Sequence, residues 1–285
     1  MRAYVMDAFT RERFGGNQAG VVFPDKPLDD ALMQAIAAEF KHSETAFVED
    51  GDGGEFSLRY FTPAGEVGLC GHATIAAFAA LYQTGRIADG SFTALTQAGK
   101  LGVSISGGSV LMDMAAPRLN GTLSMKDAAA LYEAFALDPA DRPEPFEPKI
   151  VSTGLSDIML PVKTRALLLS ARQDEAAVAA LSRRLGCVGV HMFAPGGIEC
   201  TAYCSNFAPL YGIPEECATG TANAALTYYL SLYGLIAPGV RNSFIQGEHM
   251  GRRCSIESIL LEKDGGTLIR IGGSAVMSME CSLLV

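Results

Sequence analysis

The stretch EVGLCGHATIAAFAALY, residues 66–82, decides the fold. It places a cysteine, a glycine and a histidine directly before a run of small and apolar residues, which is typical of a helix buried on all sides. A second stretch, EECATGTANAALTYY at residues 215–229, again has a cysteine just before a small-residue helix start. The two segments show a weak similarity when Cys70 is aligned with Cys217. We interpret the chain as two related lobes, each containing one such helix.

Alternating apolar and polar residues predict short strands on both sides of each core helix. Further helices are expected over residues 27–40, 125–135 and 173–186, where the apolar residues follow helical spacing. The first half closes at Pro117. The second half then repeats the order of strands, a surface helix, strands and a cysteine-led helix.

Composition excludes several functional classes. The chain has 285 residues, 49% of them hydrophobic, which is enough for a sizeable core. Lys and Arg total 22 against 31 Asp and Glu, so nucleic acid is a poor partner. No signal peptide and no membrane-spanning apolar run is apparent, and we expect a cytoplasmic protein. Seven cysteines without paired spacing favour reduced thiols over a disulfide framework.

The two helix starts suggest an anion site. The first turn of a helix has free backbone amides and a partial positive charge, which attract a carboxylate, and Gly71 and Gly220 would let a ligand approach that backbone. A thiol placed there has its thiolate stabilised, so the pKa of Cys70 or Cys217 is expected to fall toward neutrality. The alternative is that both cysteines are simply small buried apolar residues.

Glu44 and His72 are the further acid–base candidates. Glu44 lies where a helix gives way to a strand, so its carboxylate is expected either in solvent, which the spacing favours, or in a pocket with a raised pKa. His72 can move a proton or simply cap the helix start. Cys200 and Cys204 resemble half a metal site, but no second pair has zinc spacing, so we expect no metal.

Together the motifs resemble one known family. DAFTRERFGGNQAGVVF, HSETAFV, RYFTPAGEVGLCGHATIA, VSTGLSDIMLPV, NFAPLYGIPEECATGTANAAL, IQGEHMGRRCSIE and IRIGGSAVMS occur in the order found in the PhzF phenazine-biosynthesis family. The resemblance extends over nearly the whole chain. It implies a fold similar to that of diaminopimelate epimerase.

The fold that this resemblance implies is of the α+β class, with two pseudo-symmetric lobes. Each lobe is expected to be a mostly antiparallel sheet wrapped round a central helix, with the active site in the cleft between the two helix starts. We predict an N-terminal lobe over residues 1–117, to which the segment 275–285 returns, and a C-terminal lobe over residues 118–274.

The resemblance also implies site residues. The catalytic glutamate of the family falls on Glu44 and its histidine on His72, and the amides that bind the substrate carboxylate fall on the two helix starts. Members commonly have EDPATGSA before the second helix, whereas this chain has EECATGTA, with a cysteine in place of the proline. The predicted catalytic residues are Glu44, Cys70, His72, Glu216 and Cys217, and the predicted substrate-binding residues are Asn17, Ser43, Gly71, Gly220 and Thr221.

We therefore expect an isomerase of a small, carboxylate-bearing, amino-acid-like molecule. It is expected to need no cofactor, because no dinucleotide or phosphate-loop motif is present. Two chemistries fit: Glu44 shifts a proton between two carbons, or Cys70 and Cys217 racemise one carbon as an acid–base pair. The alternatives are a silent carboxylate-binding protein and a thiol hydrolase using Cys70 with His72 as base. Residues two apart on a helix start are expected to point apart, which weakens the hydrolase. A homodimer is one expected state.

Overall fold

The computed structural model describes residues 1–263 and 265–284. The chain divides into two compact units: unit 1 comprises Met1–Asp113 and Gly272–Val285, and unit 2 comprises Met114–Ile271. These limits lie near, but not at, the predicted boundaries after residues 117 and 274. The last residue of the predicted segment 275–285 lies outside the described residues.

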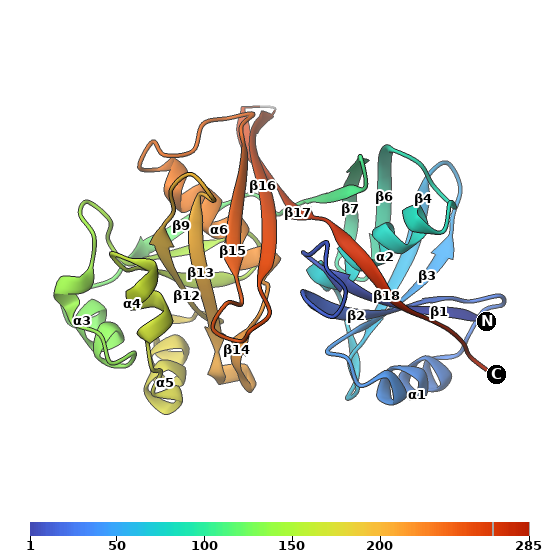
Figure 1. Cartoon of the computed structure of the whole chain (residues 1–285), viewed down its shortest axis with the longest axis horizontal. Coiled ribbons are helices and arrows are strands. Elements are labelled where there is room, and N and C mark those ends of the chain that lie inside the picture. The colour runs from blue at the N-terminus through green and yellow to red at the C-terminus, as the bar shows by residue number, and fades with distance from the viewer. Residues whose placement is uncertain (264, 285) are drawn as a thin grey trace. The chain divides into compact units, whose positions relative to one another are not determined.

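Unit 1 is a mostly antiparallel sheet with one helix packed among its strands and one on its outer side (Figure 1). Its elements are β1 (Arg2–Ala8), β2 (Asn17–Phe23), α1 (Asp30–Phe40), β3 (Thr45–Asp50), β4 (Glu55–Phe61), β5 (Glu66–Val67), α2 (Gly71–Gln83), β6 (Gly90–Thr96), β7 (Gly99–Ser106), β8 (Ser109–Asp113) and β18 (Ala275–Ser282).

The strands of unit 1 surround α2. Strand β1 pairs antiparallel with both β2 and β18, β2 pairs parallel with β3, and β4 pairs antiparallel with β3 and parallel with β6. Helix α2 contacts β1, β2, β3, β8 and β18. Ten of its thirteen residues are buried, because a helix enclosed by strands has no polar face to expose. Helix α1 is amphipathic instead, and buries Met33, Ile36 and Ala37 against the sheet.

Unit 2 has the same plan with more helices (Figure 1). Its elements are β9 (Arg118–Thr122), α3 (Met125–Glu133), η1 (Pro139–Asp141), β10 (Lys149–Ser152), β11 (Ser156–Pro161), α4 (Arg165–Ser170), α5 (Glu175–Leu185), β12 (Gly189–Pro195), β13 (Ala202–Ala208), η2 (Pro209–Tyr211), β14 (Ile213–Glu216), α6 (Gly220–Ser231), β15 (Arg241–Gln246), β16 (Cys254–Lys263) and β17 (Gly266–Gly273), whose last residues belong to unit 1.

The strand pairings of unit 2 repeat those of unit 1. An antiparallel pair β10–β11 is followed by the parallel pair β11–β12, the antiparallel pair β12–β13 and the parallel pair β13–β15. The core helix α6 contacts β10, β11, β12 and β16. Its position in unit 2 therefore corresponds to that of α2 in unit 1.

Several short elements were not predicted, among them the strand β9 and the helix α4. Helices α3, α4 and α5 contribute to a separate apolar cluster that includes Leu131, Leu168, Val178 and Phe207. This cluster covers one face of the sheet at β12 and β13, and α6 packs on the other face. Among the described residues, no helix is long and apolar enough to cross a membrane.

Candidate active site

The two core helices begin differently from the others. Helices α1, α3, α4 and α5 have side-chain N-caps, each accepting a hydrogen bond from the backbone of the first turn: Asp29, Ser124, Thr164 and Asp174. Within the described residues, the N-cap residues of α2 and α6, Cys70 and Thr219, make no such bond. The first-turn amides of α2 and α6 therefore remain without a side-chain cap and can receive an anion.

Four side chains of unit 1 meet at the start of α2. Nε2 of His72 lies 3.2 Å from Oε2 of Glu44 and 3.2 Å from Oγ of Ser43. Sγ of Cys70 lies 3.4 Å from Nδ1 and 4.0 Å from Nε2 of the same ring. His72 is 7% exposed and the Glu44 side chain 20% exposed. Glu44 thus lies in a largely enclosed cluster, and the solvent position that its spacing favoured is wrong.

The helix-start geometry explains why Cys70 contacts His72. Cys70 is the N-cap, with φ −140° and ψ 119°, so its backbone is extended rather than helical. The expectation that these side chains point apart assumed helical geometry for both residues. It is wrong, because the extended N-cap turns the thiol toward the first turn, where His72 is the second helical residue.

The cluster sets the charge of each group. Burial raises the pKa of the Cys70 thiol, and its imidazole neighbour only partly offsets this effect. The expected fall of this pKa is therefore wrong. Burial opposes ionisation of Glu44, but hydrogen bonds and charge from His72, with Ser43 and Cys70, lower its pKa. Burial also opposes the charging of His72, yet Cys70 and Glu44 raise its pKa well above the usual value. The Glu44 carboxylate, 3.2 Å from Nε2, is therefore one of two groups that favour the protonated imidazole.

We expect this pair to appear in the pH dependence of unfolding. The pKa of His72 is raised from 6.5, so its stabilising contribution is complete below 6.5 and is lost as the pH rises through the folded-state pKa. The pKa of Glu44 is lowered from 4.5, so its contribution is present above 4.5 and is lost as the pH falls through the folded-state pKa. Urea denaturation of the wild type and His72→Gln should show their largest stability difference between these values. A difference that is constant with pH would contradict the pairing.

The predicted residues of unit 2 lie around the start of α6. Oε2 of Glu216, the last residue of β14, accepts a hydrogen bond of 2.5 Å from Oγ1 of Thr219. Gly220 and Thr221 are the first two helical residues. The amide groups assigned to carboxylate binding therefore occupy equivalent positions in both units, because Gly71 and His72 are the first two residues of α2.

Cys217 is not the structural counterpart of Cys70. The N-cap position that Cys70 holds in unit 1 belongs to Thr219 in unit 2, and Cys217 lies two residues before it. The alignment of the two cysteines is thus off by two positions. Cys217 is buried, and a hydrogen bond with its thiol, together with burial, raises the pKa of Cys254. Its sulfur has a thiol partner inside unit 2.

Asn17 is the first residue of β2, opposite Ala8, and is buried. The structure therefore brings Ser43, Glu44, Cys70 and His72 together in unit 1. It separately gathers Glu216, Cys217, Gly220 and Thr221 at one helix start in unit 2. The convergence of the two groups on one site stays a prediction.

Several buried polar side chains of unit 2 were not predicted from the sequence. Gln246, Asn223 and His191 are each fully buried, and the side chains of Gln246 and Asn223 are hydrogen-bonded at 2.7 Å. Asp157 on β11 is 3% exposed, and burial together with the charge of Glu216 raises its pKa to about 7. Two signals were available in the sequence. Asp157 stands next to an apolar run, and Gln246 directly precedes a glycine turn.

The unit 1 cluster also contains metal-ligand types. One ligand atom each from Glu44, Cys70 and His72 lies within 4.8 Å of the others. Zinc would need a thiolate and a neutral imidazole, whereas the pKa values of both groups are raised. A metal would therefore have to displace both protons, as bound metals do to the thiols that coordinate them.

Comparison with known proteins identifies the class. A family model described as phenazine biosynthesis-like protein, PhzC-PhzF, matches residues 6–281, and the chain belongs to this family. An uncharacterized isomerase of Deinococcus radiodurans is 36% identical over 284 residues, covering 96% of this chain and 91% of the relative. The uncharacterized isomerase YddE of Escherichia coli K12 is 32% identical over 286 residues, covering 97% and 96%.

Solved structures share the fold. A PhzF-family phenazine biosynthesis protein of Bacillus anthracis has a TM-score of 0.89 at 24% identity, covering 100% of this chain and 99% of that one. A predicted epimerase of Pseudomonas aeruginosa has a TM-score of 0.80 at 26% identity, with coverage of 100% and 99%. The predicted family and fold class are confirmed. The protein is an isomerase, and these relatives give no support to a thiol hydrolase.

Proposed function

We propose that the protein is a cofactor-independent isomerase that moves a proton within a small, carboxylate-bearing, amino-acid-like molecule. The observation that carries this proposal is the contact of Glu44, His72 and Cys70 beside the uncapped start of α2. Such a cluster puts a proton acceptor and a proton donor next to amides that attract an anion.

In this proposal the substrate carboxylate lies on the first-turn amides of α2, at Gly71 and His72. The first turn of α6, with Gly220 and Thr221, contributes to the same site from unit 2, as does Glu216. When the proton leaves the carbon next to the carboxylate, negative charge accumulates on the carboxylate oxygens. The amides stabilise that charge because they are already oriented before the reaction.

Glu44 is the group best placed to carry the proton. Its pKa is lowered, so it is ionised at neutral pH, whereas burial keeps the Cys70 thiol protonated. A single carboxylate can take a proton from one carbon and return it to another, which is a 1,3-proton shift. His72, with a proton held on its ring, orients Glu44 through Nε2.

Racemisation is the second candidate. The distance of 3.4 Å between Sγ of Cys70 and Nδ1 of His72 favours it, because an imidazolium at that distance stabilises a thiolate. Cys217 would have to supply the opposite face. Its contact with Cys254 and its place two residues before the N-cap favour Glu44 over the two-thiol pair.

Solvent exchange tests the proposal. We expect that the protein, incubated in D2O with a panel of amino acids and related unsaturated acids, removes a carbon-bound proton from at least one of them, as followed by proton NMR. A 1,3-shift relocates the label and moves a double bond, whereas racemisation labels the α-carbon with inversion. A compound that binds without any exchange would instead indicate a silent binding protein. The homodimer stays a prediction, checked by sedimentation of the purified chain.

A further inference from the structure

The side chain of Gln246 connects the end of β14 to the start of α6. It is fully buried and belongs to the last residue of β15. Its Nε2 donates to the carbonyl oxygen of Glu216 at 2.8 Å and to Oγ1 of Thr219 at 3.3 Å. Its Oε1 accepts from Nδ2 of Asn223 at 2.7 Å and from the backbone amide of Thr219 at 3.3 Å.

These four contacts use the full hydrogen-bonding capacity of the amide. They also fix its orientation, because turning it by half a rotation would place its NH2 group against two donors and its oxygen against two acceptors. The amide of Gln246 is therefore locked by partners on both sides. A locked buried side chain can hold a reacting group in place.

The hydrogen bonds run from Gln246 through Thr219 to the carboxylate of Glu216. Thr219 has one hydroxyl proton, and it donates that proton to Oε2 of Glu216 at 2.5 Å while accepting from Gln246. This arrangement explains why Thr219 does not cap its own helix among the described residues: its hydroxyl points to the carboxylate instead. Gln246 thus fixes the Glu216 side chain and leaves the first-turn amides of α6 uncapped.

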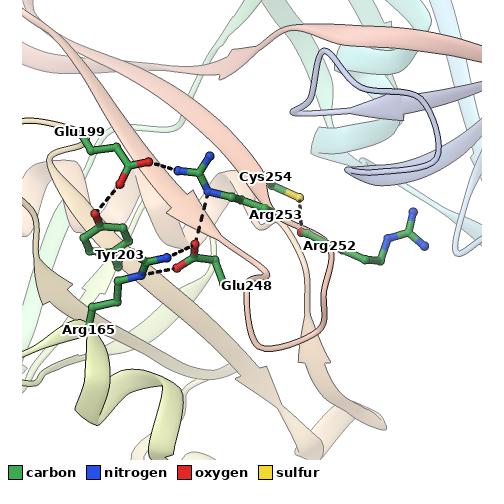
Figure 2. A network of polar contacts seen from close by, with 7 residues as sticks. All are labelled: Arg165, Glu199, Tyr203, Glu248, Arg252, Arg253 and Cys254. Atoms are coloured by element: carbon green, nitrogen blue, oxygen red, sulfur yellow. Dashed lines mark hydrogen bonds and ion pairs between the residues drawn. The ribbon is translucent and has the colours of Figure 1, made fainter.

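Ion pairs and hydrogen bonds at the protein surface hold the turn that follows Gln246 (Figure 2). Glu248 accepts two hydrogen bonds from Arg165 on α4, at 2.9 Å and 2.6 Å, and lies 3.3 Å from Nε of Arg253. Arg253 also pairs with Glu199, which accepts from Tyr203 at 2.7 Å. These charges compensate one another, so we assign the network to anchoring the turn rather than to binding a ligand.

We infer that Gln246 is a positioning residue for the isomerase reaction: through Thr219 it sets the orientation of the Glu216 carboxylate and of the first turn of α6. The inference rests on the proposed role of Glu216. Gln246 belongs to the segment IQGEHMG, residues 245–251, and the proposed mechanism uses no residue of this segment. A carboxylate moved by about 1 Å typically costs about 100-fold in rate.

The main test is Gln246→Glu, which keeps both acceptor contacts and removes both donor contacts. We expect kcat to fall about 100-fold while KM changes by less than about threefold, because orientation rather than affinity is lost. The matched control is Ser258→Ala. Ser258 is also fully buried and hydrogen-bonded to α6, through Thr227 at 2.7 Å, but it lies two turns from the helix start. A similar fall in kcat for Ser258→Ala, or no fall for Gln246→Glu, would overturn the inference.

Thr219 provides a second route if Gln246→Glu does not fold. Thr219→Val removes the hydroxyl that links Gln246 to Glu216 but keeps the backbone amide, and it should lower kcat as Gln246→Glu does. Thr219→Ser returns the hydroxyl and should recover most of the loss. An equally low kcat for the serine and valine variants would contradict the proposed relay.

A stability cycle separates this inference from the proposed function. Gln246 and Thr219 are in contact, so their effects on the unfolding equilibrium constant should be non-additive by about tenfold in urea titrations of the single and double variants. Additive effects would overturn the network whatever the reaction is. Non-additive effects combined with no proton exchange by the wild type would instead sink the proposed function alone.

Discussion

Glu44→Gln is expected to lower turnover by about 10²- to 10⁴-fold, the range that a positioned acid–base group contributes. The amide keeps the shape of the carboxylate and can still contact His72, but it cannot accept a proton at neutral pH. The cluster would lose its ionised partner, because Oε2 of Glu44 is 3.2 Å from Nε2 of His72. Proton exchange in D2O, with the substrate that the NMR panel identifies, measures the effect.

Two controls make this prediction specific. Glu49→Gln changes an exposed carboxylate on β3, the strand that begins directly after Glu44, and should leave turnover unchanged. Cys217→Ser should cost less than about tenfold, because the Glu44 mechanism uses no second thiol. A severe loss in Cys217→Ser with a mild one in Glu44→Gln would reverse the assignment and restore the two-thiol racemisation.

Gly247→Ala is expected to destabilise the protein by about 2 to 5 kcal/mol, combining the cost of a left-handed residue with that of overpacking. The residue has φ +83°, and a Cβ there would lie 2.3 Å from the carbonyl oxygen of Arg252 and 2.7 Å from that of Cys217. Both atoms belong to the backbone, so neither can rotate away. The segment that leads into α6 would have to move.

Gly251→Ala is the matched control for this change. Gly251 lies in the same turn with φ +67°, but a Cβ there would meet no atom within 4 Å. Only the left-handed strain remains, at about 1 to 2 kcal/mol. Urea denaturation measures both variants. Equal losses would show that close packing of Gly247 on Cys217 contributes nothing to stability.

Much of the fold was predictable because the two core helices are unusual in sequence. A helix with ten buried residues, such as α2, has no Asp, Glu, Lys or Arg in its sequence, whereas the surface helices α1, α3 and α5 each have at least two. Strand β9 has five residues and α4 six, so each is too short to show its period clearly.

Only part of the candidate site could be predicted from the sequence. Glu44 and His72 came from a family motif, and their contact with Cys70 depends on the extended backbone at residue 70, which no spacing rule provides. The register of Cys217 was misjudged for the same reason, since an N-cap is defined by backbone angles rather than by residue type. Gln246 was missed because its partners lie 23 to 30 residues away in the chain, and a single glutamine at a strand end has no pattern.

The place of β18 bears on the order in which the chain can fold as it leaves the ribosome. Strand β1 is completed on one side by β2 and on the other by β18, with Ala3 opposite Cys281. Unit 2 is continuous over Met114–Ile271, so all its residues emerge before β18 does. Until then β1 has an open edge, the kind of edge that recruits foreign strands. Synthesis therefore leaves the sheet of the first unit unfinished until the whole of unit 2 and then β18 have emerged.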